Sequence, residues 1–189
     1  MVTRKVVLTA DRSLMSNFRG NYILGFLSCA PSSVIPGFVY NRMFAPAVEA
    51  GPDGSAKAAP MGLRRLESAL LQDGQYGSQE VVVAHPHHIN RVVEGETEVI
   101  GISAMDPLGK GPVTSSFTHN TEHTPMNAVK FKSLIEDIES LNSNAKIVVG
   151  GGGAWQLEDR MDDFGIDYLV KGEVCHKAPE LFSSIISGD

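Results

Sequence analysis

The sequence Lys-Ile-Val-Val-Gly-Gly-Gly-Gly-Ala-Trp, residues 146–155, is the clearest indication of the fold class. Its first part, 146–149, places three β-branched residues in a row, and four glycines follow directly. A strand that is apolar at consecutive positions, instead of at every second one, is typical of parallel sheets covered by helices on both faces. We therefore predict that residues 146–149 form an inner strand of an α/β domain.

Further short runs of the same kind surround this strand along the chain. They predict strands at residues 5–9, 80–84, 98–103 and 167–170. Apolar residues spaced three and four apart fill the intervals and predict helices. These begin near Leu63, at Thr124 (with Pro125 in the first helical position), near Ala154 and at Ala178.

Alternating β and α elements imply a parallel sheet with right-handed crossovers. We predict a doubly wound α/β fold of the flavodoxin-like, Rossmann-type class, with five parallel strands and helices on both faces. The strand order 2-1-3-4-5 is taken by analogy with that class. A chain of 189 residues fits one such domain, 1–189, with a large insertion.

The insertion is expected at residues 11–60, between the first strand and its helix. Its first half carries several aromatic residues and is too apolar for a disordered linker. We expect short helices packed over the carboxyl edge of the sheet. Residues 51–59 are small and polar and are expected to form a mobile loop.

Composition excludes several classes of function. The net charge is -6 without any run of Lys or Arg, which argues against nucleic-acid binding. Only two cysteines are present, Cys29 and Cys175, so the chain alone provides neither a CxxC zinc site nor the ligands of an iron–sulfur cluster. The apolar stretch 22–30 is too short to cross a membrane, and no signal-peptide pattern precedes it. We expect a cytoplasmic protein.

Ligands of open α/β sheets bind beyond the carboxyl ends of the strands, so the loops there are the candidate sites. The loop 103–119 contains three consecutive hydroxyl residues and two glycines around Lys110. It is either a ligand loop or an ordinary long crossover. The glycines of 150–153 allow a flat group to lie against the backbone near a helix N-terminus, and the alternative is close helix–strand packing.

Histidines also follow the second and third strands: His85, His87, His88, His119 and His123. Their spacing matches no metal motif, and we interpret them as surface or loop residues. Cys175 lies near the start of the last helix, but the sequence identifies no base for it. We predict no catalytic residue and no metal ligand in this chain.

The glycine run and the segment Gly-Ile-Asp-Tyr-Leu-Val-Lys-Gly-Glu, 165–173, together resemble the end of the cobalamin-binding domain of radical-SAM proteins. In that family a strand ends in two or more glycines, and a Gly-x-Asp-Tyr-x-Val-x-Gly-Glu segment follows. The third predicted strand resembles the family's Ser-x-Leu motif, with Ser103 in the serine place and Met105 instead of leucine. The resemblance covers the first strand and the chain from about residue 63, but not the insertion.

The resemblance implies that Ser103 bonds near the nucleotide tail of cobalamin, and that Gly150 and Gly151 leave space for its dimethylbenzimidazole. The loop 106–118 would then face the corrin ring or its amide arms. The implied cofactor-binding residues are Ser103, Met105, Asp106, Pro107, Leu108, Gly109, Gly150, Gly151, Gly152, Gly172 and Glu173.

Two motifs of related proteins are missing. Cobalamin domains of methionine synthase and the mutases carry Asp-x-His-x-x-Gly after the first strand, whereas residues 11–16 read Asp-Arg-Ser-Leu-Met-Ser. The CxxxCxxC of radical-SAM cores is also absent. The resemblance therefore implies a cobalamin carrier without turnover of its own. A radical-SAM domain or partner would supply S-adenosylmethionine and the [4Fe–4S] cluster, for methyl transfer or radical chemistry.

Two other hypotheses remain open. The chain is alternatively an interaction or regulatory module of α/β type that has lost the cofactor, with side chains of the insertion filling the groove. An independent enzyme on this scaffold, using nucleotides or flavin, is the third hypothesis. It lacks a nucleophile–base set and a phosphate loop in this sequence.

Overall fold

A five-stranded, all-parallel sheet forms the centre of the protein, whose computed structural model describes residues 3–119 and 122–188. The strand order is β2-β1-β3-β4-β5, which confirms the doubly wound, flavodoxin-like α/β fold. Each predicted strand is present with ends within one residue of the prediction. The strands are β1 (Val6–Ala10), β2 (Val81–Val83), β3 (Val99–Ser103), β4 (Lys146–Gly150) and β5 (Tyr168–Leu169).

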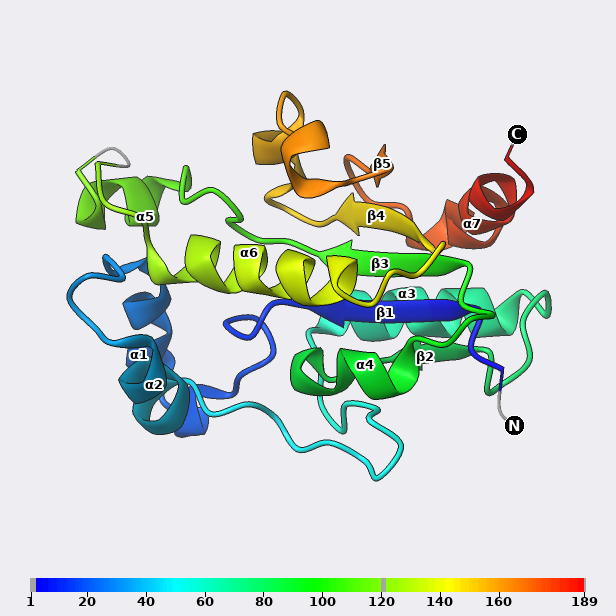
Figure 1. Cartoon of the computed structure of the whole chain (residues 1–189), viewed down its shortest axis with the longest axis horizontal. Helices are drawn as coiled ribbons and strands as arrows, with labels where there is room; N and C mark the ends of the chain where they lie inside the picture. Colours follow the sequence, from blue (N-terminus) through cyan, green and yellow to red (C-terminus); the bar gives the residue numbers. More distant parts are fainter. Residues whose placement is uncertain (1–2, 120–121, 189) are drawn as a thin grey trace.

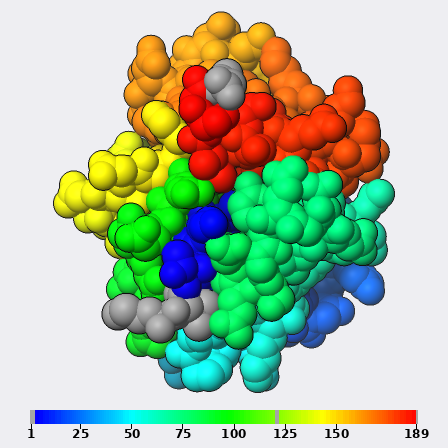
Figure 2. Space-filling view, turned by 90° about the vertical axis from the view of Figure 1, so that its right-hand side faces the viewer, coloured from blue at the N-terminus to red at the C-terminus, as the bar shows by residue number. Residues whose placement is uncertain are grey.

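Helices cover both faces of the sheet (Figure 1). On one face, α3 (Met61–Gln72) packs against α7 (Ala178–Ser187), and Figure 2 shows them side by side at the amino ends of the strands. On the other face lie α4 (Ile89–Val92) and α6 (Met126–Glu139). The sheet is thus buried on both sides, as its continuously apolar strands predict.

The long helix α6 buries the predicted stripe of Phe131, Leu134, Ile135 and Ile138. Its start differs from the prediction by one residue. Pro125, not Thr124, occupies the cap position, and no side chain caps the first N–H groups. Proline is tolerated there because the first N–H groups of a helix lack partners within the helix.

The helix predicted from Ala154 is not formed. Two short 3-10 turns replace it, η5 (Ala154–Leu157) and η6 (Asp162–Phe164), and Gly165 ends the second with a left-handed φ of 56°. Three aspartates between 158 and 163 lower the helix propensity. Two turns are enough to bring the apolar residues of this segment into the core, so the periodicity alone was misleading.

The insertion folds as short helical segments beyond the carboxyl ends of the strands (Figure 1). Its second half packs on α6 through a small cluster in which Tyr40, Ala45 and Met126 are buried. This agrees with the predicted ordered insertion over the carboxyl edge. The segments are η1 (Phe18–Gly20), α1 (Tyr22–Gly25), η2 (Phe26–Cys29), α2 (Gly37–Val39) and η3 (Tyr40–Phe44).

Residues 51–59, expected as a mobile loop, are hydrogen-bonded to the edge of the sheet. Ala56 donates its N–H to the carbonyl of Val83 (2.8 Å), and the side chain of Asp53 pairs with Arg4 at 2.8 Å. The small residues let the segment approach edge strand β2 closely. The contact covers N–H and C=O groups that would otherwise be open for pairing.

Within residues 3–119 and 122–188, no helix is long and apolar enough to span a bilayer.

Candidate functional site

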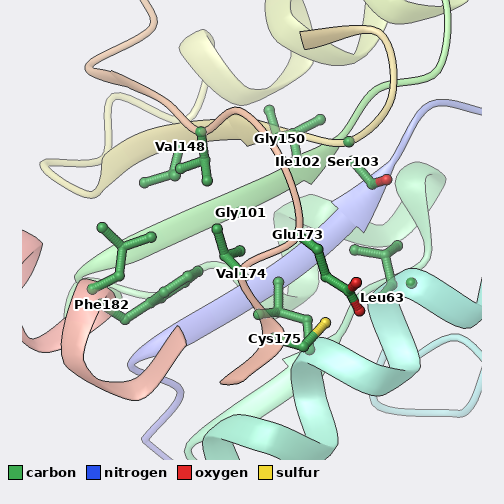
Figure 3. Close-up of a pocket in the computed structure, with 16 residues that line it drawn as sticks. Leu63, Gly101, Ile102, Ser103, Val148, Gly150, Glu173, Val174, Cys175 and Phe182 are labelled. Carbon is green, nitrogen blue, oxygen red and sulfur yellow. The ribbon is translucent and has the colours of Figure 1, made fainter. Parts of the chain in front are cut away.

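A cavity of about 180 Å³ lies where β3 and β4 end, beneath α3 and α7 (Figure 3). Alternate strand residues share one face, so Gly101 and Ser103 of β3 face the cavity beside Val148 and Gly150 of β4. Helix residues and the segment after β5 close the other sides. They are Gly62, Leu63, Leu66, Val170, Gly172, Glu173, Val174, Cys175, Leu181 and Phe182.

Missing side chains on the sheet create this hollow. A Cβ atom on Gly101 would come within 2.7 Å of the Leu8 side chain and 3.6 Å of the Phe182 ring. A Cβ on Gly150 would meet only Val170, at 3.7 Å, which is ordinary contact. A side chain at position 150 would therefore enter the cavity from the sheet side, whereas one at position 101 would collide with Leu8.

The rim of the cavity carries its few polar groups. Glu173 is exposed and forms a surface ion pair with Arg65 at 3.2 Å, a contact that contributes little to stability. Gly172 before it has a φ of 88°, a conformation that favours glycine. The rest of the lining is apolar apart from the hydroxyl of Ser103 and the half-buried thiol of Cys175.

The structure brings together five of the eleven residues implied by the resemblance. These are Ser103, Gly150, Gly151, Gly172 and Glu173, which all line the cavity. The other six do not line it: Met105, Asp106, Pro107, Leu108, Gly109 and Gly152. Met105 is 63% exposed, and the rest of this loop turns toward α6 instead of the cavity.

The loop turns away from the cavity because Asp106 is the centre of a hydrogen-bond network. Its carboxylate accepts the N–H of Gly111 (2.9 Å), the Asn127 amide (3.1 Å), the Gln156 amide (2.7 Å) and the Thr114 hydroxyl. Four donors occupy the carboxylate, so Asp106 joins the loop after β3 to α6 and to the turn after β4.

Gln156, a hydrogen-bond partner of Asp106, was not predicted from the sequence. It is 3% exposed, and its Oε1 accepts the N–H of Leu108 at 3.0 Å. A glutamine between apolar neighbours was the available signal, because a buried amide needs partners on both of its ends.

The three hydroxyl residues of this loop also have local partners. They lie in α5 (Pro112–Phe117), a short helix that was not predicted. Ser115 and Ser116 both donate to the carbonyl of Pro112, and Thr114 donates to Asp106. The interpretation of 103–119 as a structural crossover is therefore favoured over that of a ligand loop.

Replacing Asp106 by asparagine is expected to lower the free energy of unfolding by about 1–2 kcal/mol. The amide keeps the shape but turns an NH₂ group toward donors, and bonds to a neutral acceptor are weaker than bonds to a carboxylate. Urea unfolding followed by circular dichroism measures the change, with Asp159→Asn at an exposed position as the control. Unchanged stability in Asp106→Asn would mean that its carboxylate is free to serve a ligand.

Close packing accounts for two of the four glycines after β4. Gly151 has a φ of 98°, and a Cβ there would lie 2.6 Å from the carbonyl oxygen of Ala104. A Cβ on Gly153 would overlap the carbonyl group of Met105. Gly150 and Gly152 have no such conflict, so the run serves both packing and the cavity.

The histidines do not gather into a metal site. In the part of the chain that the structure describes, no three side chains of His, Cys, Asp or Glu converge closely enough to hold a metal ion. His85 lies in the loop after β2, as expected, but it is buried there, and its Nδ1 accepts the N–H of His87 at 3.1 Å. It therefore stabilises the turn after β2.

Comparisons with known protein families, with curated proteins and with solved structures found no match for this chain.

Proposed function

We propose that this chain is a cobalamin-binding domain whose cavity takes the dimethylbenzimidazole end of the nucleotide tail. The observation that carries the proposal is the apolar hollow over the carboxyl ends of β3 and β4, open because the strands present glycines there. An apolar cavity of roughly 150 Å³ is enough to bind benzene in another protein. About 180 Å³ therefore suits a fused aromatic ring, and the larger corrin would lie outside on the carboxyl edge.

The residues that line the cavity fit the dimethylbenzimidazole group and the tail that carries it. Ser103 offers a hydroxyl to the polar part of the tail at the rim, while Gly101 and Gly150 leave the flat space below. Cobalamin would supply methyl-transfer or radical chemistry, and a radical-SAM domain or partner would supply S-adenosylmethionine and its [4Fe–4S] cluster. This chain would bind and orient the cofactor.

The loop after β1 provides no imidazole for the cobalt. Ser13, the third residue of the Asp-Arg-Ser segment, is buried, and its hydroxyl accepts a hydrogen bond from Tyr40 at 3.1 Å.

Both cysteines are free thiols, which suits the reducing cytoplasmic setting that we propose.

Exposed apolar side chains support a further component at the carboxyl edge. They belong to segments that follow the strands, where exposed apolar side chains are available to a ligand or a partner. The residues are Tyr22, Ile23, Phe26, Val34, Phe38, Met43, Met61, Met105, Val113, Phe117 and Trp155.

The alternative is a module that has lost its cofactor. That hypothesis expects side chains of residues 11–60 to fill the groove. Within the described chain, the cavity lining contains no residue of 11–60. This observation favours the carrier function.

Retention of hydroxocobalamin tests the proposal. The purified protein is mixed with the cofactor, free corrinoid is removed by gel filtration, and the visible spectrum is recorded. We expect about one corrinoid per chain, and retention at least about tenfold weaker in Gly150→Leu, because that side chain would enter the cavity from the sheet.

Gly95→Leu is the matched control, since Gly95 is exposed, surrounded by open space and remote from the cavity lining. Circular dichroism verifies that both variants are folded. Equal retention by the wild type and Gly150→Leu would show that the tail does not use this cavity. No retention by the wild type at tens of micromolar would favour the cofactor-free module.

A further inference from the structure

Three basic side chains from different elements lie together near the carboxyl ends of β1 and β2. Arg12 follows β1, His87 follows β2, and Lys130 lies in the second turn of α6. The Arg12 guanidinium contacts the imidazole of His87, with Nη1 at 2.9 Å from Nδ1. Lys130 Nζ lies 5.7 Å from the centre of the Tyr40 ring, and Arg12 hydrogen-bonds to the carbonyl oxygen of Asn41, the residue after Tyr40.

The backbone holds the guanidinium in place. Arg12 donates to the carbonyl oxygens of Asn41 (2.9 Å) and Ala45 (3.2 Å), both in the insertion. These contacts orient the side chain without neutralising its charge. Arg12 is therefore positioned before any ligand binds, which reduces the entropy cost of binding.

No carboxylate forms an ion pair with Arg12 or Lys130 in the described part of the chain, although the chain carries a net charge of -6. Asp11, the acid next to Arg12 in the chain, is 5% exposed and accepts the N–H groups of Ser13 (2.8 Å) and Leu14 (3.4 Å). Its carboxylate is thus already occupied and lies below the surface.

Partial burial disfavours the positive charges of Arg12 and Lys130. Partial burial, followed by the charge of Arg12, lowers the pKa of Lys130. Desolvation, followed by the charge of Arg12, also lowers the pKa of His87 to about 4, so its imidazole is neutral near pH 7 and the positive charge of the cluster belongs to Arg12 and Lys130. Half-buried cations without a counter-ion cost free energy, which an incoming anion would recover.

The position is one where ligands of this fold bind. Asp11 and Arg12 follow β1, and α6 follows β3, so the cluster lies at the point where the strand order reverses. The cavity described above lies over β3 and β4 on the face of α3 and α7, whereas Lys130 belongs to the helix on the opposite face. The two sites are thus built from different residues.

We propose that Arg12, Lys130 and His87 form a second binding site, for the phosphate or carboxylate group of a substrate or small ligand. Arg12 and Lys130 donate charge-assisted hydrogen bonds to the oxyanion. The exposed ring of His87 forms the outer side of the site. This inference goes beyond the cofactor proposal and does not depend on it.

Titration of the protein with inorganic phosphate tests the site, and a parallel titration with succinate distinguishes a phosphate from a carboxylate ligand. Both are followed by ¹H–¹⁵N NMR at pH 7 and constant ionic strength. We expect saturable shifts of the Arg12 Nε–H signal and of the backbone N–H signals of residues 11–14 and 87–88, for at least one anion. Lys130→Gln is expected to weaken binding about tenfold, since it removes one of the two full charges.

Lys132→Gln is the matched control, because Lys132 lies on the same helix but is exposed and paired with Glu136 at 3.6 Å. Asp11→Asn, which removes the buried negative charge, should tighten binding. Shifts that do not saturate with either anion, or equal affinities of Lys130→Gln and Lys132→Gln, would overturn the proposal.

A cross-test separates the two proposed sites. Lys130→Gln should retain hydroxocobalamin like the wild type, and Gly150→Leu should keep its phosphate or succinate shifts. Loss of corrinoid retention in Lys130→Gln would assign the basic cluster to the cofactor and overturn a separate anion site.

Discussion

Gly153→Ala is expected to lower the free energy of unfolding by more than about 3 kcal/mol. The added Cβ would overlap the carbonyl group of Met105 and lie 2.7 Å from Cδ of Pro107. Both belong to the loop after β3, and the backbone there is held by the bond from Gly153 N–H to the Ala104 carbonyl (2.9 Å). A clash with backbone atoms is not relieved by a change of rotamer, so the two loops have to separate.

Gly152→Ala is the control for this effect. Its Cβ would meet only the Met105 sulfur, at 3.7 Å, and the change should alter stability by no more than about 0.5 kcal/mol. Urea unfolding of both variants measures the difference. Similar stability of the two alanine variants would mean that the loops after β3 and β4 are not packed backbone against backbone.

Asp11→Asn is expected to gain about 2–3 kcal/mol of stability relative to the wild type between pH 4 and pH 7.5. Burial is the main cause that raises the pKa of Asp11 from 3.8 to about 6, and this difference corresponds to about 3 kcal/mol. The folded protein holds this proton more tightly than the unfolded chain. The protonated carboxyl group therefore contributes its full stability to the folded wild type below pH 3.8. This contribution is lost as the pH rises through 6 and the buried group ionises.

Asparagine does not titrate, so its stability lacks this contribution to the pH dependence. Comparing the free energies of unfolding of variant and wild type at both pH values cancels the titration of histidines common to the two proteins. A difference that stays constant from pH 4 to pH 7.5 would contradict a buried, destabilising carboxylate. Such a result would also weaken the role of Asp11 in setting the charge of the basic cluster.

The main elements of this fold follow from the sequence by itself. Short apolar runs, most of them rich in β-branched residues, predict the five strands, and spacings of three and four residues predict α3, α6 and α7. These signals are local, because an element buried on both faces or along one stripe has to repeat its apolar residues at its own period. Gly150, Gly151 and Gly172, which the resemblance implies as cofactor-binding residues, line the cavity, and their binding role stays a proposal.

The side-chain partners at the two sites depend on the tertiary structure. Asp106 was expected to face a cofactor, yet its partner Gln156 stands fifty residues away, and no period connects the two. The basic cluster likewise joins Arg12, His87 and Lys130 from three separate elements. The helix expected at 154–164 is replaced by two short turns, and Gln156 in the first of them hydrogen-bonds to the loop after β3. Hydrogen bonds and charges act through space, so their partners are set only when parallel crossovers bring the carboxyl ends of the strands together.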